Sequence, residues 1–310
     1  LIVNVMPGSL WLVVFFLIPL AFMFYFSLGE RGAFGEVLVS QGNLGLQQYR
    51  KFFIPADANF FQAIWWSAAW ILEGLFPFNV SFASGEPTVY VKILVKSVSF
   101  GAMVTVLAMM VGYPVAYFIT RIVSPERRKL ALVLLLVPYW ASFLVRVYAM
   151  MLLFFGSGPV FRLLNALPFV EGVSLIYTDV AVLLGMMYIY VPFMVLPLYT
   201  TLDDIDFTLQ EAALVLGASR ITAFRRVILP LSKPGIFAGS ILVFIPATGT
   251  FVIPQILGGG SSPFIGRFIA TQFGSAGNWP LGSAAGFIFT AVILFVIGLY
   301  QWAVGGGDLA

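Results

Sequence analysis

Long apolar runs with almost no charge alternate with shorter polar segments along the whole chain. A helix needs about 20 mostly apolar residues to cross a bilayer, and inside hydrocarbon the backbone has to satisfy its own polar groups. Such runs lie at about residues 5–28, 98–122, 130–155, 179–202, 236–257 and 281–304. The pattern predicts an all-α, polytopic membrane protein, with six transmembrane helices in one domain that spans residues 1–310. Prolines inside several runs predict bent helices.

The first run and the segment after it allow other interpretations. A secretory signal peptide is also N-terminal and apolar, but this run carries no basic region, is long, and precedes five further runs. Residues 29–97 are predicted to form an external insert. Within it, residues 60–78 are apolar but interrupted by Gln62 and Glu73. This pattern favours an interfacial helix or a cap on the bundle over a seventh span.

The orientation in the membrane follows from Lys and Arg in the short loops, which concentrate on the cytoplasmic side. Two loops hold most of them: Arg121, Arg127, Arg128, Lys129, Arg220, Arg225, Arg226 and Lys233. The short loops on the other side hold only Arg162 and Arg267. The two basic loops are therefore predicted to be cytoplasmic, and six spans then place both termini in the cytoplasm as well.

Composition supports the membrane assignment and excludes several kinds of chemistry. Hydrophobic residues make up 61% of the chain and charged residues only 9%, whereas about a quarter of a soluble domain is charged. The net charge of +3 is too small to indicate a nucleic-acid partner. The chain has no Cys and no His, which excludes thiol nucleophiles, Cys/His zinc sites and Ser-His-Asp triads. It also lacks a Gly-Lys dipeptide, and with it a P-loop.

The second basic loop, residues 203–233, is polar and has helical periodicity. Thr208 and Glu211 have the spacing of a capping box, in which the Thr hydroxyl accepts from the amide three residues on and the Glu returns to the Thr amide. A helix is predicted to begin there and to end at Gly217 in a left-handed conformation. Residues 220–229 predict a second helix, stopped by Pro230 and Pro234.

A helix this short is marginal alone in water and has to be held by a contact. The residues alone leave two possibilities open, a helix that rests on its own bundle and a docking element for another protein. Arg225 and Arg226 in the next helix are placed to meet lipid headgroups or an acidic partner. Gly235 and Gly239 have the GxxxG spacing that is typical of close packing between membrane helices.

The spacing of this loop resembles that of a known family. Its order is Glu211-Ala212-Ala213, three residues, Gly217, nine residues, Val227, one residue, and Leu229-Pro230. This resembles the EAA loop of ABC importer permeases, which has Ile where this chain has Val227. Residues 139–148, 190–199 and 239–246 resemble the spermidine/putrescine branch of these permeases. The resemblance covers about residues 97–302 and leaves the insert without a clear counterpart.

The resemblance implies a transport subunit rather than an enzyme. It implies a multi-pass protein of the bacterial inner membrane that forms the path for a small organic solute, a polyamine such as spermidine or putrescine. It also implies a pair of separate ATPase subunits that bind ATP and Mg²⁺, a second permease subunit, and an external solute-binding protein. No cofactor is expected on this chain, and lipid is its other partner. The residues implied in ATPase coupling are Thr208, Glu211, Ala212, Ala213, Leu216, Gly217 and Arg220.

Candidates for the substrate path come from the residues themselves. Aromatic faces attract ammonium groups, although aromatics at helical spacing usually pack. Two prolines and a glycine in residues 246–255 predict a broken helix, where backbone carbonyls can line a cavity. The candidates are Trp140, Tyr148, Tyr188, Tyr190, Thr248, Thr250 and Gln255. Arg146, an ionisable residue well inside a run, is a candidate either for tying helices together or for lining the path.

One departure from the family pattern leaves the substrate open. Polyamine permeases that this stretch resembles often carry acidic residues near the positions of Thr250 and Gln255, and this chain has neither acid. A less cationic solute is therefore an alternative, as are acids supplied by a second permease. A secondary transporter or channel, and an intramembrane enzyme, are further alternatives. Both are disfavoured because the interiors of the runs hold no carboxylate to carry an ion or to act as an acid or base.

Overall fold

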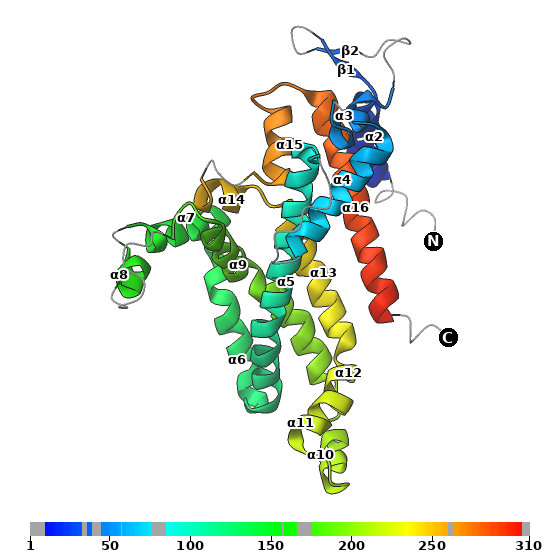
Figure 1. Cartoon of the computed structure of the whole chain (residues 1–310). Coiled ribbons are helices and arrows are strands. Elements are labelled where there is room, and N and C mark those ends of the chain that lie inside the picture. Colours follow the sequence, from blue (N-terminus) through cyan, green and yellow to red (C-terminus); the bar gives the residue numbers. More distant parts are fainter. Residues whose placement is uncertain are drawn as a thin grey trace. The chain divides into compact units, whose positions relative to one another are not determined.

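The computed structural model describes residues 10–32, 36–38, 45–56, 58–75, 85–156, 158–165, 175–259 and 263–305. Almost all of its regular structure is helical, which confirms the all-α prediction (Figure 1). The chain divides into two compact units. One consists of Leu1–Ser97 and Phe264–Phe295, and the other of Val98–Pro263 and Val296–Ala310.

The first unit begins with an apolar helix over Leu10–Ser27 that combines the π-helix η1 (Val13–Leu17) and α2 (Ile18–Ser27). The antiparallel strands β1 (Glu30–Arg31) and β2 (Val37–Leu38) follow, with Glu30 opposite Leu38. Next come α3 (Gln47–Phe53) and α4 (Phe60–Leu75). α15 (Ile265–Phe273) and the start of α16 (Trp279–Gly305) complete the unit.

Polar and aromatic contacts hold the described part of the predicted insert inside this unit. Gln48 is buried and donates to the carbonyl of Gly29 at 3.2 Å. Phe52 stacks on Tyr90, with ring centroids 5.5 Å apart, and Phe268 of α15 packs on the same tyrosine. The sequence did not indicate α3, whereas α4 lies in the apolar stretch that was predicted to form an interfacial helix or a cap on the bundle. Residues 76–78 of this stretch lie outside the described residues.

The second unit contains most of the helices. It holds α5 (Val89–Arg121) from Val98 onward, α6 (Pro125–Leu136), the 3-10 helix η2 (Val137–Trp140), α7 (Phe143–Phe154) and α8 (Pro159–Asn165). It continues with α9 (Asp179–Asp203), α10 (Thr208–Val215), α11 (Arg220–Ala223), the π-helix η3 (Phe224–Ile228) and α12 (Leu229–Leu231). α13 (Lys233–Gly249), α14 (Val252–Leu257) and the end of α16 complete it.

The packing of α9 against α13 forms the centre of this unit. A Cβ placed on Gly239 would lie 2.7 Å from Met194 Sδ, and one on Gly235 would lie 2.6 Å from Thr201 Oγ1. Only glycine lets the two backbones approach this closely, so the close packing predicted from the GxxxG spacing is confirmed. Met194, Val195 and Leu198 of α9 are fully buried in the same contact.

The candidate membrane spans agree with the predicted runs in number but not in shape. Among the described residues, four helices are long and apolar enough to cross a membrane, and two bent helix pairs raise the number to six. The second run was predicted to begin at residue 98, whereas its helix begins at Val89. Thr88 Oγ1 accepts from the amide of Val91 there and caps the helix ahead of two lysines that the hydropathy pattern places outside the span.

The third run, which contains Pro138, is strongly bent, in agreement with the bent helices predicted from the prolines. Pro125–Trp140 and Phe143–Phe154 meet at an angle of 85°. Ala141 and Ser142 both have extended backbone, with ψ of 146° and 142°, and two such residues in succession end a helix and start another in a new direction. In Figure 1, α7 accordingly turns away from the direction of α6.

Candidate functional site

The predicted coupling helix is present as α10, but its N-terminus differs from the prediction. Thr208 is the first helical residue, and the residue before it, Phe207, makes no side-chain cap. The amide of Glu211 bonds to the carbonyl of Phe207, so the predicted capping box is wrong. Instead Asp206 Oδ1 accepts from the Thr208 amide at 2.9 Å. This backbone hydrogen bond holds the pKa of the exposed Asp206 carboxyl below its usual value, because it favours the charged form.

The C-terminus of α10 agrees with the prediction. Gly217 has a φ of +88°, which lies in the left-handed region. The amide of Ala218 bonds to the carbonyl of Ala213, and the amide of Gly217 bonds to that of Leu214, both at 3.0 Å. These two bonds form a Schellman motif, which satisfies carbonyls that the helix end leaves free. The turn therefore fixes where the chain leaves the helix.

Apolar side chains at the end of α10 are unusually exposed. Val215 and Leu216 each have 88% of their surface accessible, and Ile221 at the start of α11 has 72%. Figure 1 shows α10 and α11 beyond the ends of α9 and α13. Of the two possibilities that the sequence left open, a helix resting on its own bundle would bury these side chains. The exposed apolar end is the form expected of a docking element.

The second helix of the loop continues further than predicted. The chain stays helical from Arg220 through Pro230 to Leu231, and it bends by 63° before Lys233. Pro230 follows the wide turns of η3, in which the amide of Leu229 bonds to the carbonyl of Phe224. Because the wide turns change the hydrogen-bond register just ahead of the proline, Pro230 does not stop the helix as it would in a regular α-helix. Arg225 and Arg226 are exposed on η3.

The predicted break in the fifth run is confirmed. α13 ends at Gly249, Thr250 is extended with ψ of 142°, and α14 begins at Val252. The end of α13 leaves carbonyls without an intrahelical donor. Tyr190 of α9 supplies one, because its hydroxyl donates to the carbonyl of Pro246 at 3.2 Å. Tyr190 and the broken helix thus belong to one structural feature.

The other predicted path residues occupy different surroundings. Thr248 is fully buried and its hydroxyl donates to the carbonyl of Phe244, while Gln255 is exposed on α14. Trp140 is 84% exposed, and Tyr148 and Tyr188 are about half exposed. Within the part of the chain that the structure describes, Tyr190, Thr248 and Thr250 therefore gather at the break, whereas the other three aromatic candidates lie on the surface of the unit.

A tyrosine that the path prediction did not include ties η2 to α9. The hydroxyl of Tyr139 donates to the carbonyl of Tyr188 at 2.8 Å and also reaches that of Ile189. Pro192 lacks the amide that would bond to the Tyr188 carbonyl in a helix, so the tyrosine replaces the missing donor. Pro192 lies four residues after Tyr188, and this spacing was the sequence signal that the Tyr188 carbonyl needs a donor from outside its own helix.

Arg146 lies on α7 next to this contact. Its guanidinium carbon is 4.2 Å from the centroid of the Tyr139 ring, a cation–π contact that bridges the two sides of the 85° bend. Its Nε and Nη1 atoms are buried and make no hydrogen bond to the described residues. The stacking supports the helix-tying role among the two roles predicted for Arg146.

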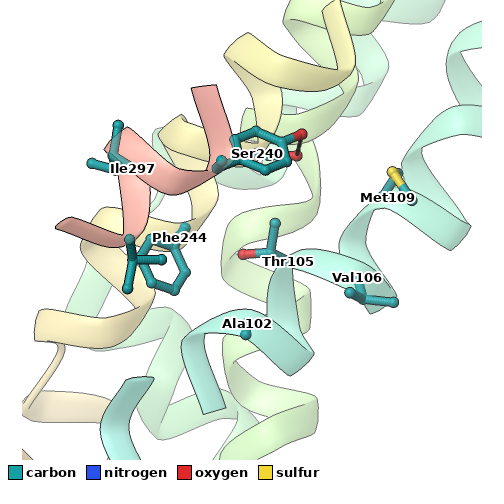
Figure 2. A pocket seen from close by; sticks show the side chains of 9 residues that line it. Ala102, Thr105, Val106, Met109, Ser240, Phe244 and Ile297 are labelled. Atoms are coloured by element: carbon teal, nitrogen blue, oxygen red, sulfur yellow. Dashed lines mark hydrogen bonds between the residues drawn. The ribbon is translucent and has the colours of Figure 1, made fainter. Parts of the chain in front are cut away.

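An apolar cavity of about 260 Å³ lies between α5, α13 and α16, apart from the residues above (Figure 2). Thr105 and Met109 of α5, Phe244 of α13 and Ile297 of α16 contribute to its wall. Its polar side chains have partners, since the Tyr300 hydroxyl donates to Ser240 at 3.3 Å and the Thr105 hydroxyl donates to the carbonyl of Gly101 at 2.7 Å. None of the predicted path residues lines it. The described residues also contain no cluster of acidic side chains suited to a metal ion.

A bundle of apolar spans, a broken fifth helix and an exposed helix in a basic loop together define an integral-membrane transport permease. Residues 110–304 match the family of binding-protein-dependent transport system inner membrane components, and the chain belongs to this family. It is therefore a transport subunit and not an enzyme.

Several proteins similar to this chain are also named as transport permeases. The chain is similar to the spermidine/putrescine transport system permease protein PotB of Haemophilus influenzae, with 35% identity over 69% of this chain and 75% of the relative. It is 36% identical to PotB of Escherichia coli K12, over 68% of this chain and 77% of the relative. Its identity with the E. coli inner membrane ABC transporter permease protein YdcU is 32%, over 67% and 69% of the two chains.

The fold is also that of a solved importer. A chain of a bacterial ABC transporter involved in the import of the acidic polysaccharide alginate superimposes with a TM-score of 0.66, over 99% of this chain and 95% of that chain. The identity between them is 14%, so this similarity concerns the fold. The predicted six-helix permease fold is thereby confirmed.

Proposed function

We propose that this chain is the permease subunit of an ATP-driven importer for polyamines such as spermidine or putrescine. In this proposal α10 docks on one of two separate ATPase subunits, which bind ATP and Mg²⁺. An external binding protein delivers the solute, and a second, related permease completes the path. The observation that carries the proposal is the exposed apolar end of α10, closed by Gly217 in a loop with the EAA spacing.

The polyamine assignment is supported by the names of the PotB relatives. Tyr190 at the break offers an aromatic ring beside Thr250, where backbone carbonyls and hydroxyls can bind ammonium groups. A less cationic solute is the second candidate, since neither Thr250 nor Gln255 is acidic. For such a solute, hydroxyl and amide groups along the path would suffice.

The coupling role is tested by disrupting α10 in the assembled importer. We expect Glu211→Lys and Ala213→Asp to abolish copurification with the ATPase and ATP-dependent spermidine uptake into proteoliposomes. Glu211→Lys reverses a charge on the docking helix, and Ala213→Asp introduces a charge there without a partner. Glu126→Lys, a charge reversal at an exposed site of α6, is the matched control and should behave as wild type.

The outcomes separate the parts of the proposal. Unchanged docking and uptake in both α10 variants would contradict the coupling role. Spermidine uptake without ATP would indicate a secondary transporter or channel. ATP hydrolysis stimulated by the binding protein without spermidine uptake would exclude the polyamine and leave the less cationic solute.

A further inference from the structure

Two ion pairs join the two basic loops of the second unit. Arg121, the last residue of α5, places Nη2 3.1 Å from Oε1 of Glu211 on α10. Arg128 of α6 places Nη1 2.5 Å from Oδ1 of Asp203 at the end of α9. Glu211 is the acidic residue of the EAA signature, so the first basic loop holds the helix that the proposed function assigns to ATPase docking.

Arg121 makes a second contact with the same segment. Its guanidinium carbon lies 4.9 Å from the ring centroid of Phe207, the residue just ahead of α10. Tyr117, one turn earlier on α5, packs edge-on against Phe207 and against Phe224. Both the N-terminal residue before α10 and its acidic side chain are therefore fixed to α5. α5 and α10 are far apart in the chain, so these contacts connect α10 to the bundle directly and not through its chain neighbours α9 and α13.

The same helix touches the break in α13. A Cβ on Gly101 of α5 would overlap Thr248 Oγ1, so the two backbones are in close contact at the last turn of α13. Within the second unit, α5 thus contacts the coupling segment through Arg121 and the broken helix through Gly101. α5 is helical without a break from Val89 to Arg121, although Pro114 lies between the two contacts, and closely packed interiors transmit strain.

We propose that Arg121 is a positioning residue that links α10 to α5, so that displacement of the docking helix moves α5 and, through Gly101, the break at Thr248. This inference rests on the proposed function and adds a second mechanical connection to it. The Arg121 and Glu211 side chains are 38% and 62% exposed, and ion pairs this exposed contribute little to folding stability. Loss of the Arg121–Glu211 ion pair should therefore reduce the coupling of ATP hydrolysis to transport rather than the folding stability.

A double-mutant cycle tests this role in the assembled importer with its ATPase and binding protein. We expect Arg121→Gln to lower the amount of solute transported per ATP hydrolysed roughly threefold. Copurification with the ATPase should be retained. Because Arg121 and Glu211 act as one pair, the loss in the double variant Arg121→Gln/Glu211→Gln should be smaller than the product of the two single losses. Arg121→Lys should recover part of the loss, since it keeps the charge but not the planar stacking.

Arg127→Gln, at an exposed site of the same loop, is the matched control and should couple as wild type. The inference is overturned if Arg121→Gln also couples as wild type, or if the losses of the two single variants multiply in the double variant. Ala213→Asp distinguishes this failure from that of the proposed function. Loss of docking in Ala213→Asp with normal coupling in Arg121→Gln contradicts only the role of Arg121.

Discussion

Gly101 lies at one of the closest helix contacts within the second unit. A Cβ there would overlap Thr248 Oγ1, and Thr248 is fully buried, β-branched and bonded to Phe244, so it has little room to move. We expect Gly101→Ala to destabilise the unit by about 1–3 kcal/mol through overpacking. The thermal unfolding midpoint of the detergent-solubilised importer measures this loss.

A matched glycine controls for helix propensity in that measurement. A Cβ added to Gly298 of α16 would have no atom of the described residues within 4 Å, so Gly298→Ala should leave the midpoint unchanged or raise it. Thr248→Ala removes the clashing hydroxyl and should restore much of the stability of Gly101→Ala. If both glycine variants unfold at the same temperature, the close contact between α5 and α13 is wrong.

At the scale of single residues, a conformation was predictable where one residue type strongly favours it. Gly217 was predicted to be left-handed because only glycine adopts positive φ without strain at the end of a helix, and its φ is +88°. The capping box failed because two residues compete for the same end. Asp206 lies close enough to accept the Thr208 amide, and Thr208 is then drawn into the helix. Residue spacing alone does not decide whether Asp206 or Thr208 caps the helix, because both are residue types that can do so.

The break between α13 and α14 depends on a donor from another helix. The hydroxyl of Tyr190 bonds to the carbonyl of Pro246, which would otherwise be unsatisfied near the end of α13. We expect Tyr190→Phe to destabilise the importer by about 1–3 kcal/mol, the typical cost of a buried acceptor left without a partner. Thermal unfolding with and without spermidine measures it, and the variant should also transport more slowly.

Tyr188→Phe is the control for this element, because the Tyr188 side chain is about half exposed and it is the backbone carbonyl that accepts from Tyr139. Its stability should match wild type. An unfolding midpoint for Tyr190→Phe equal to that of Tyr188→Phe would show that the broken helix does not need this hydrogen bond.

At the scale of helices, breakers were better predictors than hydropathy. Pro246, Gly249 and Pro254 lie close together, and the predicted break occurs among them. The third run contains Pro138, and the prediction of bent helices agrees with its 85° bend, which lies at Ala141 and Ser142 rather than at the proline itself. The start of α5 was predicted too late because Lys92 and Lys96 lie in its first turns. Charged residues mark the limit of a membrane span, but a helix can continue beyond that limit.

At the scale of the whole molecule, sequence alone indicated the membrane class and the family, because both depend on pattern and spacing. The arrangement of the candidate site depends on tertiary contacts that spacing does not encode. Tyr139 and Arg121 were missed for this reason, since their partners lie on helices distant in the chain. Trp140 and Tyr148 were predicted path residues, and they lie exposed on either side of the 85° bend.

The orientation of the chain in the membrane remains a prediction from the distribution of Lys and Arg, and the absence of cysteine from the sequence allows a direct measurement. Ser124, Asp204 and Ser275 are exposed positions in three connecting segments. Single cysteines there report the side of each segment without background labelling. If six spans place both basic loops in the cytoplasm, Ser124→Cys and Asp204→Cys should react with an impermeant maleimide only after the membrane is opened. Ser275→Cys, between the last two spans, should react in intact spheroplasts. Labelling of Asp204→Cys in intact cells would place α10 outside, where no ATPase could reach it, and would contradict the orientation and the docking role together.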